Sequence, residues 1–546
     1  MTFERTPEQR RQDSEAIGRE SLDAERGAYY RPARRAATNL AVFPTTDGPS
    51  RAKLPDLDAG NLDLPAITAA ALAALERSND PPTLFRFGGM PVRLERDEFD
   101  APVVRPLTED RLRHALARAG NWFVSRSKGP QAALPPVHVV RDCLAHHDQP
   151  FPVLERIVEA PVFDRTGSIH AVPGYSSTSR LYLAAPAALH VPPVADRPTA
   201  QEIDQARDLL VLDLLGDFPF VGDAERAHAL ALILTPFLRD LIVGSTPLFL
   251  IEKPSPGTGA SLLAEAALWP MLGRALAVTV EASTDEEWRK KILARLSTSP
   301  VANLIDNVRR RLDSASLSAA ITADVFEDRV LGTSNTLKIP VRCLWIATAN
   351  NPALSNEITR RCVRIRLDAR VDQPWMRTGF QHPDLRAWMT AERPRLVWAA
   401  LTLGQAWVAA GRPTGAATMG NFEKWAGVLG GVLEIAGVQG FLGNLTDFYS
   451  SADEETATWR AFIAAWWHRF GGQRVGVADL FGLVNAEAAP TSVDAIPLDL
   501  GDRGERSQRT RLGKLLHAQR DRVFDGYRIT TDRKVEGAQG WRLAEV

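Results

Sequence analysis

The sequence predicts a multidomain α/β protein whose central domain is built on a parallel sheet. The chain has 546 residues, which is more than one ordinary hydrophobic core accommodates. Its middle contains short continuous apolar runs, as expected of strands buried on both faces, and one run leads through a glycine-rich loop into a helix. Segments on either side show helical periodicity or alternation between turns, so we expect further domains there.

Composition limits the classes of function that fit the chain. Hydrophobic residues make up 45% and charged residues 24%, which are values of a globular protein, and the net charge of −1 means that any nucleic acid must be bound by local basic patches. The sequence has no run of about 18 apolar residues and no signal-peptide core at its start, so we expect a cytoplasmic protein with no membrane partner. Cys143, Cys343 and Cys362 have no paired spacing and are expected to be buried or incidental thiols.

The first 245 residues carry little recognisable chemistry. We expect a mobile arm over 1–60, an α+β accessory domain over 61–195 and a helical collar over 196–245, opened by a capping box of Thr199 and Glu202. Within the accessory domain the patterns predict a hairpin turning at Gly88-Gly89, helices over 108–127 and 136–147, and short strands over 153–192.

The central segment begins with a strand, a glycine-rich loop and a helix. An apolar run at 248–251 is followed by the loop Glu252 to Ser261 and then by a strong helix start. Glycines in such a loop let backbone N–H groups turn inward, and the helix N-terminus adds positive potential, so the layout is typical of a phosphate-binding loop. The residues that would surround the phosphates are Gly257, Thr258, Gly259, Ala260 and Ser261, and the Ser261 hydroxyl is placed to ligate Mg²⁺. An ordinary turn between a strand and a helix is the alternative.

Two further strands end in polar residues that suit nucleotide chemistry. After a helix opened by a capping box of Ser283 and Glu286, the strand at 301–305 ends in Asp306 and Asn307. A carboxylate at this position can hold Mg²⁺, whereas Asn307 can orient a water but cannot accept its proton. The strand at 341–347 ends near Asn350, whose amide can reach a γ-phosphate.

Two adjacent arginines follow the third strand. Arg360 and Arg361 lie where an arginine can cross to the nucleotide of a neighbouring subunit and stabilise transition-state charge. A solvated or salt-bridged face is the alternative for both.

These motifs, in this order, give residues 247–370 a family resemblance. The segment resembles the AAA+ ATPases and, within them, the superfamily 3 and phage or plasmid primase-helicase group. Four motifs carry it: Pro256-Gly-Thr-Gly259 resembles Walker A, Leu304-Ile-Asp-Asn307 Walker B, Ile346 to Asn351 sensor 1, and Thr359-Arg-Arg361 the arginine-finger region. The resemblance implies ATP with Mg²⁺ bound between subunits of a homo-hexamer, Asp306 and Ser261 on the metal, Asn350 at the γ-phosphate, and Arg360 or Arg361 acting in trans.

The same resemblance covers a hairpin. Residues 328–340 resemble the hairpin that precedes sensor 1 and grips DNA in a central channel, which implies Lys338 and, more weakly, Arg329 as DNA contacts. A plain surface hairpin is the alternative.

The phosphate loop departs from the family at one decisive position. The lysine of the motif is replaced by Ala260, and its first glycine by Pro254. Loss of one aimed charge removes several kcal/mol of transition-state stabilisation. Three explanations stay open: Ala260 is an engineered substitution, the chain is a natural pseudo-ATPase, or Lys253 reaches in from upstream.

The C-terminal part adds an independent indication of DNA binding. We expect a helical lid over 371–487 and a winged-helix domain over 488–546, in which a basic helix precedes a β-hairpin. The helix would enter the major groove and the wing would touch phosphates. The residues concerned are Arg506, Arg509, Arg511 and Lys514 on the helix and Arg533 and Lys534 on the wing. A solvated charged face is the alternative.

The resulting expectation is a ring-forming DNA helicase and ATPase that serves replication of a phage, plasmid or integrated element, with DNA, its own copies and other replication proteins as partners. A non-catalytic DNA-binding loader or scaffold is the competing hypothesis, favoured by Ala260 and Asn307.

Overall fold

The computed structural model describes residues 54–329, 336–452, 454–484, 498, 500, 504–535 and 538–546. Most of the predicted arm over 1–60 lies outside these residues, and its end forms the strand β1, Asp56–Asp58. Among the described residues, no helix is both long and apolar enough to cross a membrane. All three cysteines are buried, as expected, and burial raises the pKa of the Cys143 and Cys343 thiols to about 12.

The N-terminal region is a mixed α/β structure. The predicted hairpin at Gly88-Gly89 is confirmed. The helix predicted over 108–127 is shorter and ends at Ala119, because the backbone becomes extended at Gly120 and the next residues form a strand in which Trp122 pairs with Leu57. The elements up to the second predicted helix are α2 (Leu64–Ser78), β2 (Leu84–Phe87), β3 (Met90–Arg96), β4 (Pro102–Pro106), α3 (Glu109–Ala119), β5 (Asn121–Arg126), β6 (Gly129–Ala132) and α4 (Val137–Ala145).

The short strands expected over 153–192 are present. They are β7 (Arg156–Val158), β8 (Val162–Phe163), β9 (Ile169–His170), β10 (Gly174–Ser176) and β11 (Leu181–Leu183). This segment packs on the helices that follow, because Arg156 forms an ion pair of 2.9 Å with Asp240 and both side chains are buried.

The segment predicted as a helical collar is helical. It comprises α5 (Ala200–Asp208), the π-helical turn η2 (Leu209–Leu214), α6 (Asp223–Leu238) and the 3-10 turn η3 (Arg239–Leu241). The capping box is confirmed: the Glu202 N–H donates to Thr199 Oγ1, and the Thr199 N–H donates to the Glu202 carboxylate.

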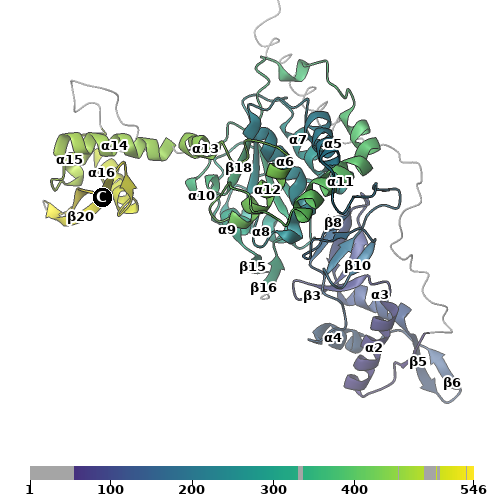
Figure 1. Cartoon of the computed structure of the whole chain (residues 1–546). Helices are drawn as coiled ribbons and strands as arrows, with labels where there is room; N and C mark the ends of the chain where they lie inside the picture. Colours follow the sequence, from purple (N-terminus) through teal and green to yellow (C-terminus); the bar gives the residue numbers. More distant parts are fainter. Residues whose placement is uncertain are drawn as a thin grey trace, which may run out of the picture. The chain divides into compact units, whose positions relative to one another are not determined.

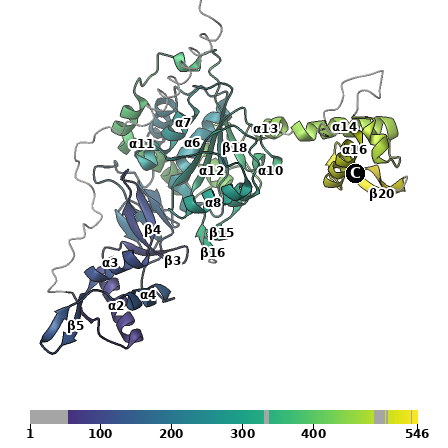
Figure 2. The same cartoon turned by 180° about the vertical axis from the view of Figure 1, so that it is seen from behind.

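The centre of the molecule is a five-stranded parallel sheet in the order β13-β14-β17-β12-β18. Helices surround this sheet in both views (Figure 1, Figure 2). The strands β12, β14 and β17 are largely buried, as their continuous apolar runs predict, whereas Val278 of the edge strand β13 is 58% exposed. In chain order the elements are β12 (Leu248–Lys253), α7 (Ala260–Leu272), β13 (Val278–Thr279), α8 (Asp285–Leu296), β14 (Ala302–Val308), α9 (Ala315–Thr322), β15 (Val325–Arg329), β16 (Thr336–Pro340), β17 (Leu344–Asn350), α10 (Asn356–Thr359) and β18 (Cys362–Arg366).

The spatial order of the strands differs from their order along the chain. The strand that ends in Asn350 lies between the strand before the phosphate loop and the strand that carries Asp306. Because all five strands are parallel, their carboxyl ends meet at one edge of the sheet.

The cap predicted at Ser283 is one residue off: Thr284 caps α8 and accepts from the Glu287 N–H.

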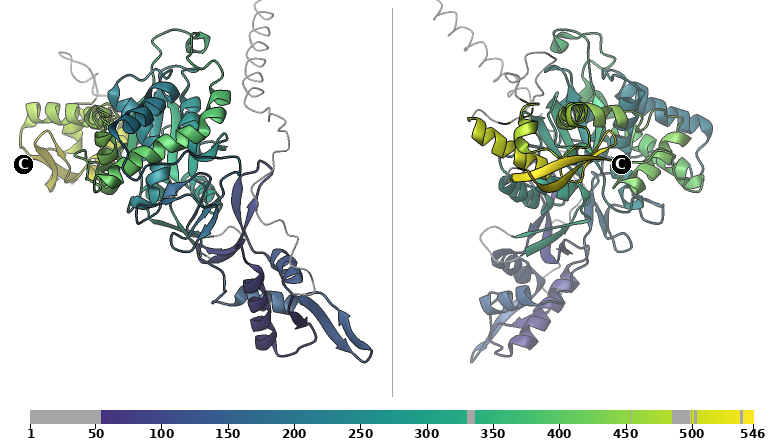
Figure 3. Two further views of the ribbon diagram at one scale, coloured as in Figure 1. Left: turned by 45° about the vertical axis from the view of Figure 1, so that its right-hand side comes forward. Right: turned by 90° about the vertical axis from the view of Figure 1, so that its left-hand side faces the viewer.

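Two further parts follow the sheet. The first contains the 3-10 turn η4 (Pro374–Met376), α11 (Leu385–Ala409), α12 (Glu423–Ile435) and α13 (Leu445–Ala452). The second contains α14 (Glu454–Phe470), α15 (Val477–Phe481), α16 (Glu505–Ala518), β19 (Val523–Phe524), β20 (Tyr527–Val535) and β21 (Ala538–Glu545). The ribbon of β20 and β21, in yellow, is clearest in the right-hand view of Figure 3.

The C-terminal part has a hydrophobic core of its own. Its buried residues run from Trp459 and Trp466 of α14 to Leu512 of α16 and Trp541 of β21. The boundary predicted at 488 therefore falls inside this core, because α14 and α15 supply much of its apolar surface. Of the domain predicted over 488–546, residues 488–497, 499, 501–503 and 536–537 lie outside the described residues.

Candidate functional site

The phosphate loop is shaped by two glycines in the left-handed region. Gly257 has φ 78° and Gly259 has φ 98°, a conformation that costs side-chain-bearing residues roughly 1–2 kcal/mol. Gly259 is the N-cap of α7 and supplies no side-chain cap, so the first N–H groups of the helix face the loop. Inside the loop, Thr258 Oγ1 donates to the Ser255 carbonyl at 2.7 Å. Backbone donors at a helix N-terminus are suited to an anion such as phosphate.

An acidic corner lies beside this loop. Ser261 Oγ donates to Asp306 Oδ1 at 2.7 Å, and Thr348 Oγ1 donates to the same oxygen at 2.6 Å. These side chains come from α7, β14 and β17, whose ends meet at the carboxyl edge of the sheet. The structure thus brings the predicted metal residues Ser261 and Asp306 into direct contact.

Thr348 was missed by the sequence reasoning. Its side chain is 1% exposed, and its Oγ1 also accepts the Asn307 N–H at 2.8 Å. The only indication in the sequence is a hydroxyl near the end of a buried strand. It points to a role at the site only once β17 is known to lie between β12 and β14.

The fit of the corner to a cation follows from its chemistry. One carboxylate and two hydroxyls are hard oxygen ligands, and Mg²⁺ characteristically takes only one or two protein carboxylates together with waters and phosphate oxygens. No cluster of three or more His, Cys, Asp or Glu residues suited to a metal exists within the described ranges. Asp306 and Ser261 would hold Mg²⁺ with a bound nucleotide.

Asn307 adopts an unusual backbone conformation. Its φ is 56°, and the pairing of β14 with β17 is interrupted between Ile305 and Val308. Asparagine tolerates this region better than most residues. The Asn307 amide, with its oxygen turned toward Arg309, accepts from Nε at 3.3 Å and Nη2 at 3.2 Å. The Asn307 side-chain amide therefore lies against the Arg309 guanidinium.

The remaining residues predicted for catalysis lie at the ends of β17 and α10. Asn350 is exposed at the end of β17 and lies opposite Lys253 of β12. The N–H of the following residue, Asn351, donates to the Lys253 carbonyl at 3.1 Å. Lys253 is half-buried and has interactions of its own.

The two candidate arginines differ. Arg361 bends back on its helix, with an ion pair of 3.2 Å to Glu357, and its side chain is 16% exposed. Arg360 is exposed, and its Nε donates to the Asn356 carbonyl at 3.3 Å. Of the two, Arg360 is the better placed to reach another molecule.

The hairpin of β15 and β16 carries the predicted channel residues. Lys338 is exposed and forms a cross-strand ion pair of 3.4 Å with Glu327. Arg329 is exposed at the end of β15. Residues 330–335, which connect the two strands in the sequence, are not among the described ones.

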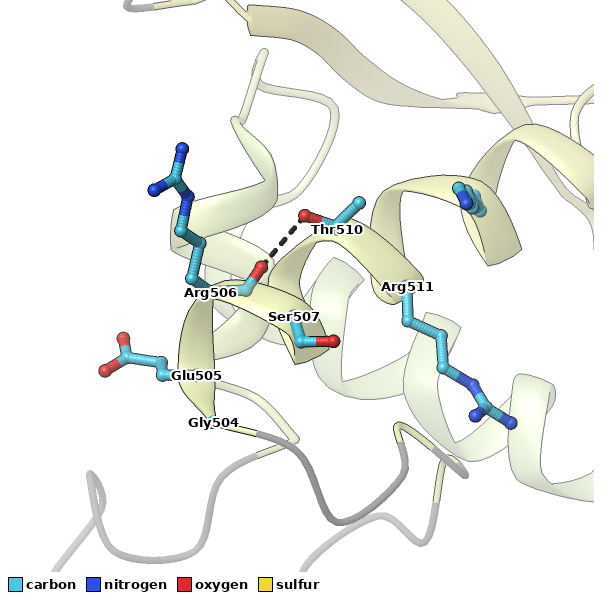
Figure 4. A pocket seen from close by; sticks show the side chains of 7 residues that line it. Gly504, Glu505, Arg506, Ser507, Thr510 and Arg511 are labelled. Carbon is cyan, nitrogen blue, oxygen red and sulfur yellow. Dashed lines mark hydrogen bonds between the residues drawn. The ribbon is translucent and has the colours of Figure 1, made fainter.

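The basic helix α16 borders an open hollow of about 730 Å³, lined by Gly504, Glu505, Arg506, Ser507, Thr510, Arg511 and Lys514. Figure 4 shows Arg506 and Arg511 extending away from the helix in different directions. Arg509 is held differently, because it pairs with Glu505 and its guanidinium lies 5.3 Å from the centre of the Phe481 ring.

The predicted wing residues lie on β20. Arg533 is exposed, and its N–H donates to Asp532 Oδ1 at 2.7 Å. Lys534 is in the same strand, but its side chain is outside the described part of the chain.

No protein-family model and no curated protein matches the chain. Among solved structures, it is similar to the active helicase Cch of SCCmec type IV, with 12% identity, a TM-score of 0.33 and coverage of 85% of this chain and 97% of that chain. It is also similar to the apo C-terminal region of NrS-1, with 9% identity, a TM-score of 0.29 and coverage of 83% and 96%. The JCV helicase has 13% identity, a TM-score of 0.20 and coverage of 49% and 72%. At these values we draw no functional conclusion from the similarity.

Proposed function

We propose that the chain is a nucleotide-dependent DNA-binding protein of the AAA+ helicase kind, which uses ATP and Mg²⁺. The observation that carries the proposal is the shared hydrogen bonding of Ser261 and Thr348 to Asp306 beside a glycine loop that opens α7. A hydroxyl and a carboxylate joined at the carboxyl edge of a parallel sheet, next to backbone donors, suit the metal and phosphates of one nucleotide.

The role that we propose for each residue follows from its position in this site. The N–H groups of Gly257 to Ser261 would bind phosphate oxygens, and Asp306 and Ser261 would hold Mg²⁺, which would supply positive charge to the phosphates. Asn350 lies at the adjacent strand end, where an amide can orient the attacking water or the γ-phosphate. Arg360, exposed at the end of α10, is the proposed trans-acting arginine of a ring, for which a hexamer is the state that the resemblance implies.

DNA binding is proposed for two surfaces. The hairpin would contact the DNA backbone through Lys338 and Arg329, which are both exposed. The exposed basic side chains of α16 would contact duplex DNA. The order of elements, α14, α15, α16 and then the β20–β21 ribbon, supports a winged-helix arrangement. A role in replication of a phage, plasmid or integrated element is the setting that the resemblance implies.

A nucleotide-binding scaffold without hydrolysis is the second candidate. Ala260 offers no ammonium group to the β- and γ-phosphates, and the Asn307 amide, which lies against Arg309, cannot accept a proton from water. Both observations weaken turnover while leaving the corner that binds the metal complete.

The deciding experiment measures ATP hydrolysis with and without single-stranded DNA for the wild-type chain, Ala260→Lys and Ala260→Met. The methionine variant matches the length of lysine without its charge. We expect Ala260→Lys alone to turn over about 100-fold faster than the wild type and to be stimulated by DNA, because one aimed donor contributes on that order. If none of the three hydrolyses ATP while all bind DNA, the motor is excluded and the scaffold takes its place.

DNA binding by α16 is tested separately with matched arginines. Arg506→Ala should weaken duplex binding and lower the slope of log affinity against log salt by about 1, because one phosphate contact is lost. Arg395→Ala is the control, since Arg395 lies on α11, outside the proposed DNA surface, is also exposed and pairs with Glu392 at 2.7 Å. Equal effects of both substitutions would indicate non-specific attraction and would remove α16 from the proposal.

A further inference from the structure

The segment that follows β18 carries bare apolar side chains next to the phosphate loop. Trp375 is 58% exposed and Met376 is 65% exposed, both on the short turn η4. Val371 and Phe380, on either side of η4, are also exposed. A large aromatic ring left open to water forgoes much of its hydrophobic stabilisation, so a reason for its exposure is needed.

Trp375 touches the loop itself. A Cβ on Gly257 would lie 2.9 Å from Trp375 Cβ, 3.2 Å from its Cε3 and 3.3 Å from its backbone nitrogen. Such distances are too short for a real side chain, so the contact exists only because residue 257 is glycine. Phe218 lies similarly near the second glycine, 3.7 Å from the position of a Cβ on Gly259. Each of the two glycines that shape the loop is thus covered by one aromatic residue.

Hydrogen bonds to Asp217 hold the segment that carries Trp375 in place beside the loop. The Asp217 carboxylate accepts the N–H groups of Gln381 at 2.9 Å and His382 at 3.4 Å, and the Asp217 carbonyl accepts Arg377 Nη2 at 3.2 Å. The Arg377 guanidinium in turn lies 5.3 Å from the centre of the Phe380 ring. Asp217 precedes Phe218 in the chain, so one short segment fixes both aromatic residues against the loop.

We propose that Trp375 is the platform on which the base of the bound nucleotide stacks. The proposal rests on the proposed function, because it assigns the base of the nucleotide whose phosphates occupy the loop. Every nucleobase has a π-face, and stacking on an aromatic side chain is tolerant of base identity. The site therefore takes a nucleoside triphosphate with little preference among purines. Stacking of the base also supplies part of the affinity for the nucleotide, although Ala260 stands where the motif has its lysine.

The test compares a ligand that has a base with one that has none. Binding of ATP and of inorganic tripolyphosphate, each with Mg²⁺, is measured by calorimetry on the full chain and on Trp375→Ala, Trp375→Phe and Met376→Ala. We expect Trp375→Ala to weaken ATP about tenfold and to leave tripolyphosphate unchanged, because only the stacking interaction is lost. Trp375→Phe should recover part of the loss, and Met376→Ala, the exposed neighbour on the same turn, should bind both ligands as the wild type does.

The outcomes separate this inference from the proposed function. If the wild type binds neither ligand, the proposed nucleotide site itself is absent. If the wild type binds ATP and Trp375→Ala binds it equally well, or loses ATP and tripolyphosphate in equal measure, Trp375 is not a base platform. A Trp375→Ala chain that keeps its ATP affinity but changes its oligomeric state by sedimentation would assign the exposed ring to a second copy of the chain and overturn the inference.

Discussion

The phosphate loop and the acidic corner are two halves of one candidate site, yet they depart unequally from what a nucleotide motor needs. The loop keeps its glycines but has Ala260 in place of a lysine, whereas the corner of Asp306, Ser261 and Thr348 is complete. The corner is built from hydrogen bonds among the chain's own side chains. The loop, by contrast, offers only backbone donors to a phosphate.

The difference separates binding from catalysis. Backbone N–H groups and a bound Mg²⁺ stabilise the phosphates of the ground state, but charge that develops in the transition state requires an aimed donor. A chain with a complete corner and an incomplete loop should therefore hold Mg²⁺-nucleotide and turn it over slowly. Each half of the site can be disturbed without the other, which makes the comparison testable.

The largest effect is expected from Asp306→Asn. The substitution keeps the size of the side chain but removes the negative charge that attracts Mg²⁺, so Mg²⁺ should no longer strengthen ATP binding, a loss of at least about 100-fold in the Mg²⁺-dependent part. Calorimetric titration with ATP in Mg²⁺ and in EDTA measures this difference. Asp313→Asn, which alters an exposed carboxylate soon after β14, is the control and should behave as the wild type. An Asp306→Asn chain that still responds to Mg²⁺ would show that the metal is held elsewhere.

A smaller effect is expected from Thr348→Val. Valine has the shape of threonine but leaves the Asn307 N–H without its acceptor and Asp306 without one donor, which costs roughly 1–3 kcal/mol. We expect a lower free energy of unfolding in urea and about tenfold weaker Mg²⁺-ATP binding. Thr348→Ser keeps the hydroxyl and should lie close to the wild type in both measurements. If Val and Ser variants are alike, the hydroxyl does not support the corner.

The two halves also differ in how far the sequence alone could predict them. Gly257, Gly259 and Ser261 are predictable because their geometry is local: a buried strand, a turn that needs positive φ and a helix start follow one another in the chain. Thr348 could not be found in this way, because its role depends on β17 lying between β12 and β14.

Two further features were not predicted, one for a local reason and one because it joins distant segments. The cap of α8 was placed at Ser283 because the stretch Ser-Thr-Asp-Glu-Glu offers two hydroxyls and two glutamates in register. The contact of Trp375 with Gly257 joins segments far apart in the chain, and no periodicity in either segment indicates it.

The smallest effect is expected from Gly257→Ala, which disturbs the loop and its contact with Trp375 but leaves the corner unchanged. Alanine there would be strained at φ 78° and would press on Trp375, so we expect Mg²⁺-ATP to bind several-fold more weakly while the Mg²⁺ dependence of binding persists. Gly411→Ala is the matched control, because its φ is 84° and its added Cβ would meet no atom within 4 Å. Both variants carry the same backbone strain, and only Gly257→Ala adds the contact with Trp375. If Gly411→Ala lowers ATP affinity as much, the loss reflects global strain, and the loop would not be an independent half of the site.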